Sequence, residues 1–158
     1  MKPYRITIHC SDTRNATRFP AAWIRRWHID RNGWDDIGYH LVIQPCGEVE
    51  RGRGLNVQGA HVASDNYGNV GICLIGRDRF SHNQFDALRY QLESICQTYD
   101  IERWAVYMHN QFASAQRQGK TCPNIPINEF LAWWLENDTH AIDPFIIGPE
   151  VIPNKTVI

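Results

Sequence analysis

The sequence predicts an α/β domain built on a single mixed β-sheet that is flanked by helices. Segments with strand patterns alternate along the chain with segments of helical period, which is typical of this fold class. Residues 69–76 form an almost continuous apolar run, as expected for a central strand that is buried on both faces. The chain of 158 residues is long enough to bury a substantial core in one domain.

Local patterns predict the elements of the first half of the chain. Residues 4–10 alternate polar and apolar side chains before a Ser-Asp-Thr turn, which indicates a strand. Residues 20–33 place apolar side chains at helical spacing and end in glycine, which predicts an amphipathic helix. Residues 39–49 indicate a hairpin, because a Pro-Cys-Gly turn separates two short strand patterns.

The second half predicts two further helices and a tail. Residues 82–99 and 127–137 have helical period, and residues 103–108 between them indicate a strand. Residues 138–158 contain three prolines and several large apolar side chains, but no period. We therefore expect one main domain, residues 1–137, and a C-terminal tail that packs on it as an extended strap.

Composition and charge exclude several classes of function. The net charge of −1 lacks the basic surplus of a nucleic-acid-binding protein, so we expect no nucleic-acid partner. No stretch approaches the roughly 18 apolar residues of a membrane span, and no secretory signal precedes the first strand pattern. Five cysteines without close pairing are expected to be reduced thiols, mostly buried. Six tryptophans are many for this length and suit a groove that holds sugar or peptide.

Three side chains with metal-binding chemistry follow predicted strands or precede a helix. His9 ends the first strand pattern, His109 directly follows residues 103–108, and Cys122 lies just before the last predicted helix. Sites in α/β sheets gather beyond the carboxyl ends of the strands. Two imidazoles and one thiolate can form a three-ligand zinc site with an open fourth position, as catalytic zinc requires. The spacing alone does not specify this triple, because no CxxC or HExxH motif is present and single His or Cys residues are usually structural.

Longer motifs follow one another along the chain: IHCS (8–11), W-x-D-I-G-Y-H (34–40), GAH (59–61), NVGICLIG (69–76) and K-T-C-P (120–123). With these motifs, and most closely over residues 33–76, the sequence resembles the zinc-dependent N-acetylmuramoyl-L-alanine amidases of the amidase-2 type. This family includes short phage lysozymes that are amidases, and the animal peptidoglycan recognition proteins. The resemblance covers about residues 6–135.

The resemblance implies a role for each matching residue. The zinc ligands of the family fall on His9, His109 and Cys122, and its catalytic tyrosine falls on Tyr39. The lysine of the phage branch falls on Lys120, two residues before the cysteine. By this resemblance, zinc lowers the pKa of bound water from about 16 toward 7. Lys120 and the Tyr39 hydroxyl are then the candidate donors to the oxyanion of the muramoyl-alanine amide.

Two further positions match the substrate groove of the family. His61 of GAH is expected to be either a groove residue or a buried hydrogen-bonding residue, and Trp34 is expected to bind substrate. Cys73 occupies a strand position at which some bacterial relatives have a glutamate, so a mechanism with that glutamate as the base does not apply here.

The expected function is cleavage of peptidoglycan between N-acetylmuramic acid and L-alanine by a monomeric phage or prophage endolysin. Such an enzyme is made in the host cytoplasm without a signal peptide and acts on the cell wall after release. Two alternative enzymes are a cytoplasmic amidase that recycles wall fragments and an antibacterial effector. An alternative of a different class is a non-catalytic peptidoglycan-binding module, which the presence of the complete ligand triple argues against.

The remaining histidines and Cys10 have structural explanations. His40 points away from Tyr39 on its strand and is expected to be a structural histidine with satisfied hydrogen bonds. His28 and His140 are expected at the surface or an interface, and His82 is expected to act locally where a helix begins. Cys10 faces away from its neighbour on the strand and is expected to lie in the core.

Overall fold

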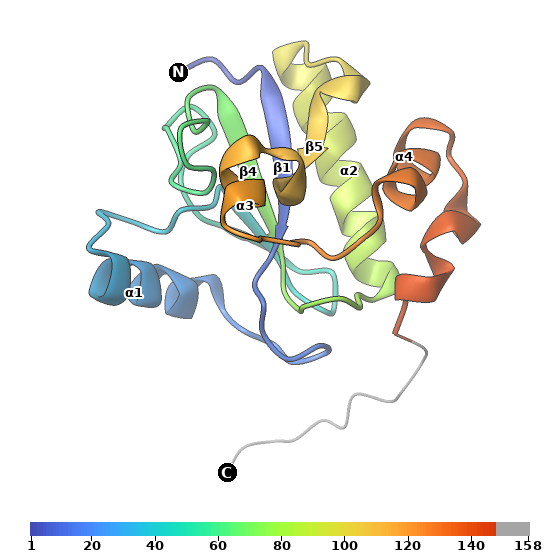
Figure 1. Ribbon diagram of the computed structural model, residues 1–158, viewed down its shortest axis with the longest axis horizontal. Helices are drawn as coiled ribbons and strands as arrows, with labels where there is room; N and C mark the ends of the chain where they lie inside the picture. The colour runs from blue at the N-terminus through green and yellow to red at the C-terminus, as the bar shows by residue number, and fades with distance from the viewer. Residues whose placement is uncertain (148–158) are drawn as a thin grey trace.

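A five-stranded mixed sheet with the strand order β3-β2-β4-β1-β5 forms the centre of the structure (Figure 1). The structure is a computed structural model and describes residues 1–147. β1 is parallel to β4 and β5, and β4 is parallel to β2, whereas β3 is antiparallel to β2. The prediction of one mixed sheet is therefore confirmed. The strands are β1 (Arg5–Cys10), β2 (Leu41–Ile43), β3 (Val49–Arg51), β4 (Asn69–Leu74) and β5 (Val106–Met108).

Helices connect these strands. The α-helices are α1 (Ala21–Asn32), α2 (His82–Tyr99), α3 (Ala113–Arg117) and α4 (Ile127–Leu135), and the 3-10 helices are η1 (Arg103–Ala105), η2 (His109–Gln111) and η3 (Thr139–Phe145). Within residues 1–147, no helix has the length and apolar character that crossing a bilayer would require.

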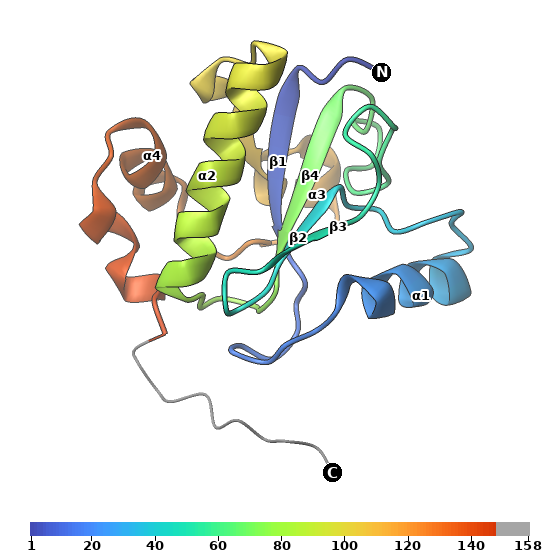
Figure 2. The same ribbon diagram turned by 180° about the vertical axis from the view of Figure 1, so that it is seen from behind.

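The two faces of the sheet are covered in different ways. Helix α2 covers one face and contributes Phe85, Leu88 and Leu92 to the largest core cluster, which also contains β1 and β4 side chains (Figure 2). On the opposite face, α1 packs through a smaller cluster, and α3 contacts Tyr107 of β5. The part of this second face between α1 and α3 holds the polar residues of β1, including His9. A site can therefore form there, at the carboxyl ends of the parallel strands.

Capping interactions fix the start of α2 against the sheet. Ser81 and Gln84 form a capping box, in which each side chain accepts a hydrogen bond from the backbone amide of the other residue, both at 3.0 Å. The buried side-chain amide of Gln84 also donates hydrogen bonds to the backbone carbonyl groups of Ile43 and Ile75. Ile43 is the last residue of β2, and Ile75 directly follows β4. These bonds satisfy backbone groups at the carboxyl end of the sheet and hold α2 across it.

Two local elements differ from the sequence-based prediction. The predicted strand over residues 103–108 begins with η1, and only Val106–Met108 pair with β1. The Ala105 amide donates to the Glu102 carbonyl at 2.8 Å, so the segment turns before it reaches the sheet. Helix α3 was not predicted, because five residues are too few to show a helical period.

The first part of the predicted tail forms a 3-10 helix instead of an extended strap. The Asp138 side chain caps η3 by accepting a hydrogen bond from the His140 amide at 3.0 Å. Ile142 is buried in the main core, and Phe80 exchanges backbone hydrogen bonds with Phe145 and Ile147. Residues 139–147 thus pack on the domain near the start of α2. The remainder of the predicted strap, residues 148–158, lies outside the described residues.

Ile142→Ala tests how much η3 stabilises the domain. Ile142 is 4% exposed, so removal of its side chain should lower the free energy of unfolding by about 2 kcal/mol or more. The matched change Ile29→Ala removes a side chain that is 40% exposed on α1 and should cost clearly less. Denaturant unfolding measures both free energies, and equal small effects of the two changes would contradict a stabilising role of Ile142.

Truncation after Asn137 should lower the melting temperature further, because it removes all of η3.

Candidate active site

His9, His109 and Cys122 converge at the carboxyl ends of β1 and β5. One potential ligand atom from each residue lies within 4.8 Å of the others. His9 is the penultimate residue of β1, and His109 begins η2 directly after the neighbouring strand β5. The two imidazole rings have a centroid distance of 4.5 Å. Pairing of adjacent parallel strands therefore brings two of the three side chains together, and the loop before α4 brings the third.

Hydrogen bonds hold the Cys122 loop against β1, η2 and the segment that follows β4. The Cys10 amide donates to Cys122 Sγ at 3.0 Å, and the Asn110 amide donates to the Cys122 carbonyl at 3.0 Å. The Asn124 side-chain amide donates to the Arg77 carbonyl at 2.7 Å. An amide N–H that points at the sulfur favours its thiolate form, which is the metal-binding form.

The electrostatics of the triple suit a metal ion. Burial, followed by the nearby His61 and His109 rings, lowers the pKa of His9 well below its ordinary value. Burial and the Lys120 ammonium lower the pKa of His109. Both imidazoles are therefore neutral at pH 7, as metal binding requires. Hydrogen bonding with the Cys10 side chain and burial raise the pKa of Cys122, and a bound cation would offset this effect and stabilise the thiolate.

His61 connects His9 to the backbone. His61 Nδ1 lies 3.0 Å from His9 Nε2, and His61 Nε2 lies 3.0 Å from the Asn69 carbonyl oxygen. A carbonyl only accepts hydrogen bonds, so His61 Nε2 carries a proton. Burial lowers the pKa of His61 to about 3, so the ring is neutral and its Nδ1 accepts from His9 Nε2. This chain leaves His9 Nδ1 unprotonated and available to a metal.

Two glycines make room for the His61 ring. A Cβ atom at Gly71, in the middle of β4, would lie 2.7 Å from His61 Cγ, and a Cβ atom at Gly59 would lie 2.6 Å from His61 Cδ2. The Asn66 side chain accepts a hydrogen bond from the His61 backbone amide at 2.8 Å. The orientation of the ring is thus fixed from several sides.

The seven site residues predicted from the sequence line a single cavity of about 580 Å³. Tyr39 lies beside the triple, with its ring centroid 5.1 Å from that of His9. Burial, with smaller contributions from nearby cysteines, raises the pKa of Tyr39 well above its ordinary value, so the hydroxyl remains a hydrogen-bond donor. Lys120 is exposed on the loop before α4, which also lines this cavity. The seven predicted site residues that line this cavity are His9, Trp34, Tyr39, His61, His109, Lys120 and Cys122.

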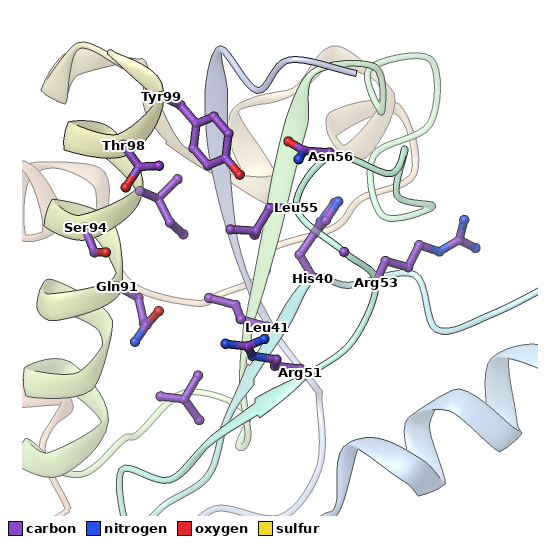
Figure 3. Close-up of a pocket in the computed structure, with 13 residues that line it drawn as sticks. His40, Leu41, Arg51, Arg53, Leu55, Asn56, Gln91, Ser94, Thr98 and Tyr99 are labelled. Atoms are coloured by element: carbon purple, nitrogen blue, oxygen red, sulfur yellow. The ribbon is translucent and has the colours of Figure 1, made fainter.

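A second cavity, of about 550 Å³, lies between α2 and the β2–β3 hairpin (Figure 3). Arg51, Gln91 and Tyr99 point into it from its different walls. His40 also lines it, but both ring nitrogens of His40 already have backbone partners, the Gly71 amide and the Val57 carbonyl. Among the described residues, the only group of at least three clustered potential metal ligands is the triple in the other cavity. The candidate metal ligands therefore lie in the cavity around His9.

Comparison with known proteins decides the family. The profile of the N-acetylmuramoyl-L-alanine amidase family, Amidase_2, matches residues 1–125. The chain belongs to this amidase family. The amidase resembles the endolysin of Escherichia phage T7, with 31% identity over 146 residues that cover 87% of this chain and 89% of the endolysin. The endolysin of Klebsiella phage KP32 is 34% identical over 148 residues, which cover 88% of this chain and 90% of that protein.

A solved structure agrees with this membership. The N-acetylmuramoyl-L-alanine amidase LysC from Clostridium intestinale URNW aligns with a TM-score of 0.71 and 26% identity, covering 83% of this chain and 84% of that one. The predicted fold class and the resemblance based on motifs are both confirmed. The protein is an N-acetylmuramoyl-L-alanine amidase, a hydrolase of peptidoglycan, and it has a cluster of two histidines and a cysteine whose potential ligand atoms lie close enough together to hold a metal ion.

The prediction that His28 of the amidase lies at the surface or an interface was wrong, because His28 is buried within the chain itself. His28 is 6% exposed, and its Nδ1 accepts a hydrogen bond from the Gly38 amide at 3.0 Å. Burial lowers its pKa to about 4. Its ring lies between those of Trp34 and Tyr39, at 4.7 and 5.5 Å, so it supports the wall of the cavity. Its helical spacing from the buried Ile24 of α1 is the signal that could have revealed its burial.

The other histidines of the amidase lie where the sequence indicated. His40 is fully buried with both ring nitrogens hydrogen bonded. His140 is exposed and pairs with Asp143 at 3.1 Å, and His82 is the exposed first residue of α2. Cys10 is buried in the main core, as predicted. Trp27 was not predicted as a site residue, although it lines the cavity and stands exposed on α1.

Proposed function

We propose that the amidase is a zinc-dependent endolysin that cleaves peptidoglycan between N-acetylmuramic acid and L-alanine. The observation that carries the proposal is the single cavity that contains the ligand triple together with Tyr39 and Lys120. Two imidazoles and one thiolate form a donor set that zinc favours, and three protein ligands leave a position open for catalysis. The similar phage proteins are named endolysins, which supports this biological role.

The residues of the cavity have distinct chemical tasks. When bound, zinc supplies a Lewis acid and a means of activating water at neutral pH. The Tyr39 hydroxyl, which stays protonated, donates a hydrogen bond to the carbonyl oxygen of the scissile amide as negative charge develops there. The Lys120 ammonium, on the loop before α4, stabilises the same charge. Trp34 borders the cavity beside Tyr39 and contacts the substrate.

His61 has a positioning role in this proposal as well as a place in the substrate cavity. Through its bond to His9 Nε2 it holds the tautomer that presents His9 Nδ1 to the metal. Outer hydrogen-bond partners of this kind orient metal-binding histidines and raise their basicity.

His61→Phe is expected to weaken zinc binding by about 10–100-fold, because His9 loses the acceptor that fixes its tautomer. His61→Gln retains a carbonyl oxygen that can accept from His9, so it should restore part of the affinity. Competition with a chromophoric chelator measures the dissociation constants without any use of activity. Unchanged zinc affinity in His61→Phe would show that His61 serves the substrate only.

The biological setting completes the proposal. The enzyme acts as a single chain, is made in the host cytoplasm, and reaches the wall after another protein has opened the membrane. Incubation of the zinc-loaded protein with purified peptidoglycan tests the activity. New amino termini on L-alanine without new reducing sugar ends are expected, whereas new reducing ends would show glycosidase chemistry and contradict the proposal.

A further inference from the structure

Helix α1 presents a row of aromatic side chains to solvent. Trp23 and Trp27 are 64% and 56% exposed, and they follow one another at a spacing of one helical turn. The Phe19 ring precedes them and contacts Trp23 edge to face, with a centroid distance of 5.6 Å. The helix is anchored to the domain by Ala21, Ile24 and His28, so the fold does not require these exposed tryptophans. Exposed aromatic surface of this kind marks a binding site.

The aromatic row continues into the active-site cavity. A hollow of about 240 Å³ is lined by Phe19, Trp27 and Tyr39, and a further hollow of about 410 Å³ is lined by Phe19, Trp23 and Trp27. Trp27 lines both hollows and the cavity of the metal ligands, and Tyr39 lines the first hollow and that cavity. Because they share these side chains, the three spaces lie next to one another beside α1, and together they are called the α1 trough.

We propose that the α1 trough binds the glycan strand of peptidoglycan, with Trp27 and Trp23 stacking on successive sugar rings. The inference rests on the proposed function, because the muramoyl sugar is joined to the scissile amide through the lactyl group. With that amide at the metal ligands, the sugar lies within a few bonds of them and the strand must continue along one wall. The trough that begins at Tyr39 and Trp27 provides that wall.

The chemistry of the trough suits a sugar polymer. A pyranose ring has faces of C–H groups, which pack on flat indole rings, and edges of hydroxyl groups, which need hydrogen-bond partners. Arg26, Asp30 and Arg31 border the outer hollow and supply both donors and acceptors. Arg26 and Asp30 make only a long 3.4 Å contact in solvent, so both remain available to hydroxyl groups.

The loop before α4 lines the same cavity with different chemistry. It contributes Lys120, Thr121 and Asn124, which are polar or cationic side chains. Such a wall suits the amides and carboxylates of a stem peptide, whereas the aromatic wall suits sugars. The aromatic side chains of α1 therefore suit the glycan part of the substrate, and the polar loop before α4 suits its peptide part.

Kinetics on two substrates of different glycan length test the proposal. Trp23→Ala is expected to lower kcat/KM for glycan strands of several disaccharides by about tenfold, mainly through KM, since truncated aromatic anchors commonly cost this much. The effect on a muramoyl peptide with one sugar should be much smaller, because one sugar does not reach Trp23. The matched control Trp104→Ala removes a tryptophan that is 66% exposed on η1, away from the trough, and should change neither value. An equal loss on both substrates, or no loss on either, would overturn the assignment.

Direct binding separates this inference from the amidase activity. The zinc-loaded protein is titrated with a peptide-free tetrasaccharide of N-acetylglucosamine, and tryptophan fluorescence or NMR shifts report binding. Trp23→Ala should weaken binding about tenfold, and Trp23→Tyr should restore more of it than Trp23→Leu, because stacking needs a flat ring. If the tetrasaccharide does not bind, or if lipid vesicles bind through Trp23 in its place, the assignment of the α1 trough to glycan is wrong even when hydrolysis is intact. If the tetrasaccharide binds but the protein cleaves no amide in peptidoglycan, the proposed function fails while the α1 trough remains a glycan-binding site.

Discussion

Cys122→Ser is expected to reduce the zinc content from about one ion per chain to a small fraction and to abolish most hydrolysis. A serine hydroxyl is a poor replacement for a thiolate, and the Cys10 amide that points at the sulfur would lose its anionic acceptor. Loss of a Lewis acid that contributes several kcal/mol lowers the rate by about three orders of magnitude. Metal analysis of the purified variant, with kcat on a muramoyl peptide, measures both effects.

Cys46→Ser is the matched control for this experiment, because Cys46 is an exposed cysteine that is remote from the cavity. It should retain the zinc content, the rate and the melting temperature of the unchanged protein. Full zinc occupancy and full activity in Cys122→Ser would remove Cys122 from the ligand set. The geometry of the triple would then have no role in catalysis.

Tyr39→Phe and Lys120→Ala should retain zinc and fold, but each should lose about 10²–10³ in kcat. Each change removes one donor to the developing oxyanion, which is worth about 3–4 kcal/mol in a water-poor site. Neither side chain belongs to the ligand triple, so the metal content should remain near one. The measurement is kcat normalised to bound zinc, together with a melting curve.

Two exposed residues provide matched controls for these variants. Tyr67→Phe removes a hydroxyl from an exposed ring, and Lys2→Ala removes an exposed ammonium group, and neither residue lines the cavity. Both should behave as the unchanged protein does. Normal rates in Tyr39→Phe and Lys120→Ala would mean that other groups stabilise the oxyanion.

The sheet was predictable because its strands carry strong local signals. β4 is buried along its whole length, and its almost continuous apolar run indicated this position. Helix α2 has a clear helical period, and its predicted bounds, residues 82–99, agree with the structure. By contrast, η1, α3 and η3 are short, and their formation depends on hydrogen bonds and packing that no periodic pattern records.

Different residues of the site were predictable from different kinds of information. The positions of His9 and His109 at strand ends follow from topology, because adjacent parallel strands end at the same edge. Selection of Tyr39 and Lys120 from all other tyrosines and lysines required the family motifs. The link from His61 to His9 could not be predicted, because it depends on the space that Gly59 and Gly71 leave for one ring. His28 was missed because its polar side chain hid its position on the buried face of α1.

The contact between Cys10 and Cys122 has a consequence for how the chain holds together. It joins residues that are 112 positions apart, so it closes a very long loop and must offset the conformational entropy of that closure. A metal ion held by His9 and Cys122 would act as a cross-link across the same loop, and its binding energy would then order the segment of residues 109–124. The core between α2 and the sheet consists mainly of aliphatic and aromatic side chains, to which Cys10 and Cys122 add only a small part. The concentration of metal would therefore change the free energy of local opening of residues 109–124. The free energy of global unfolding would still depend mainly on the sheet and α2.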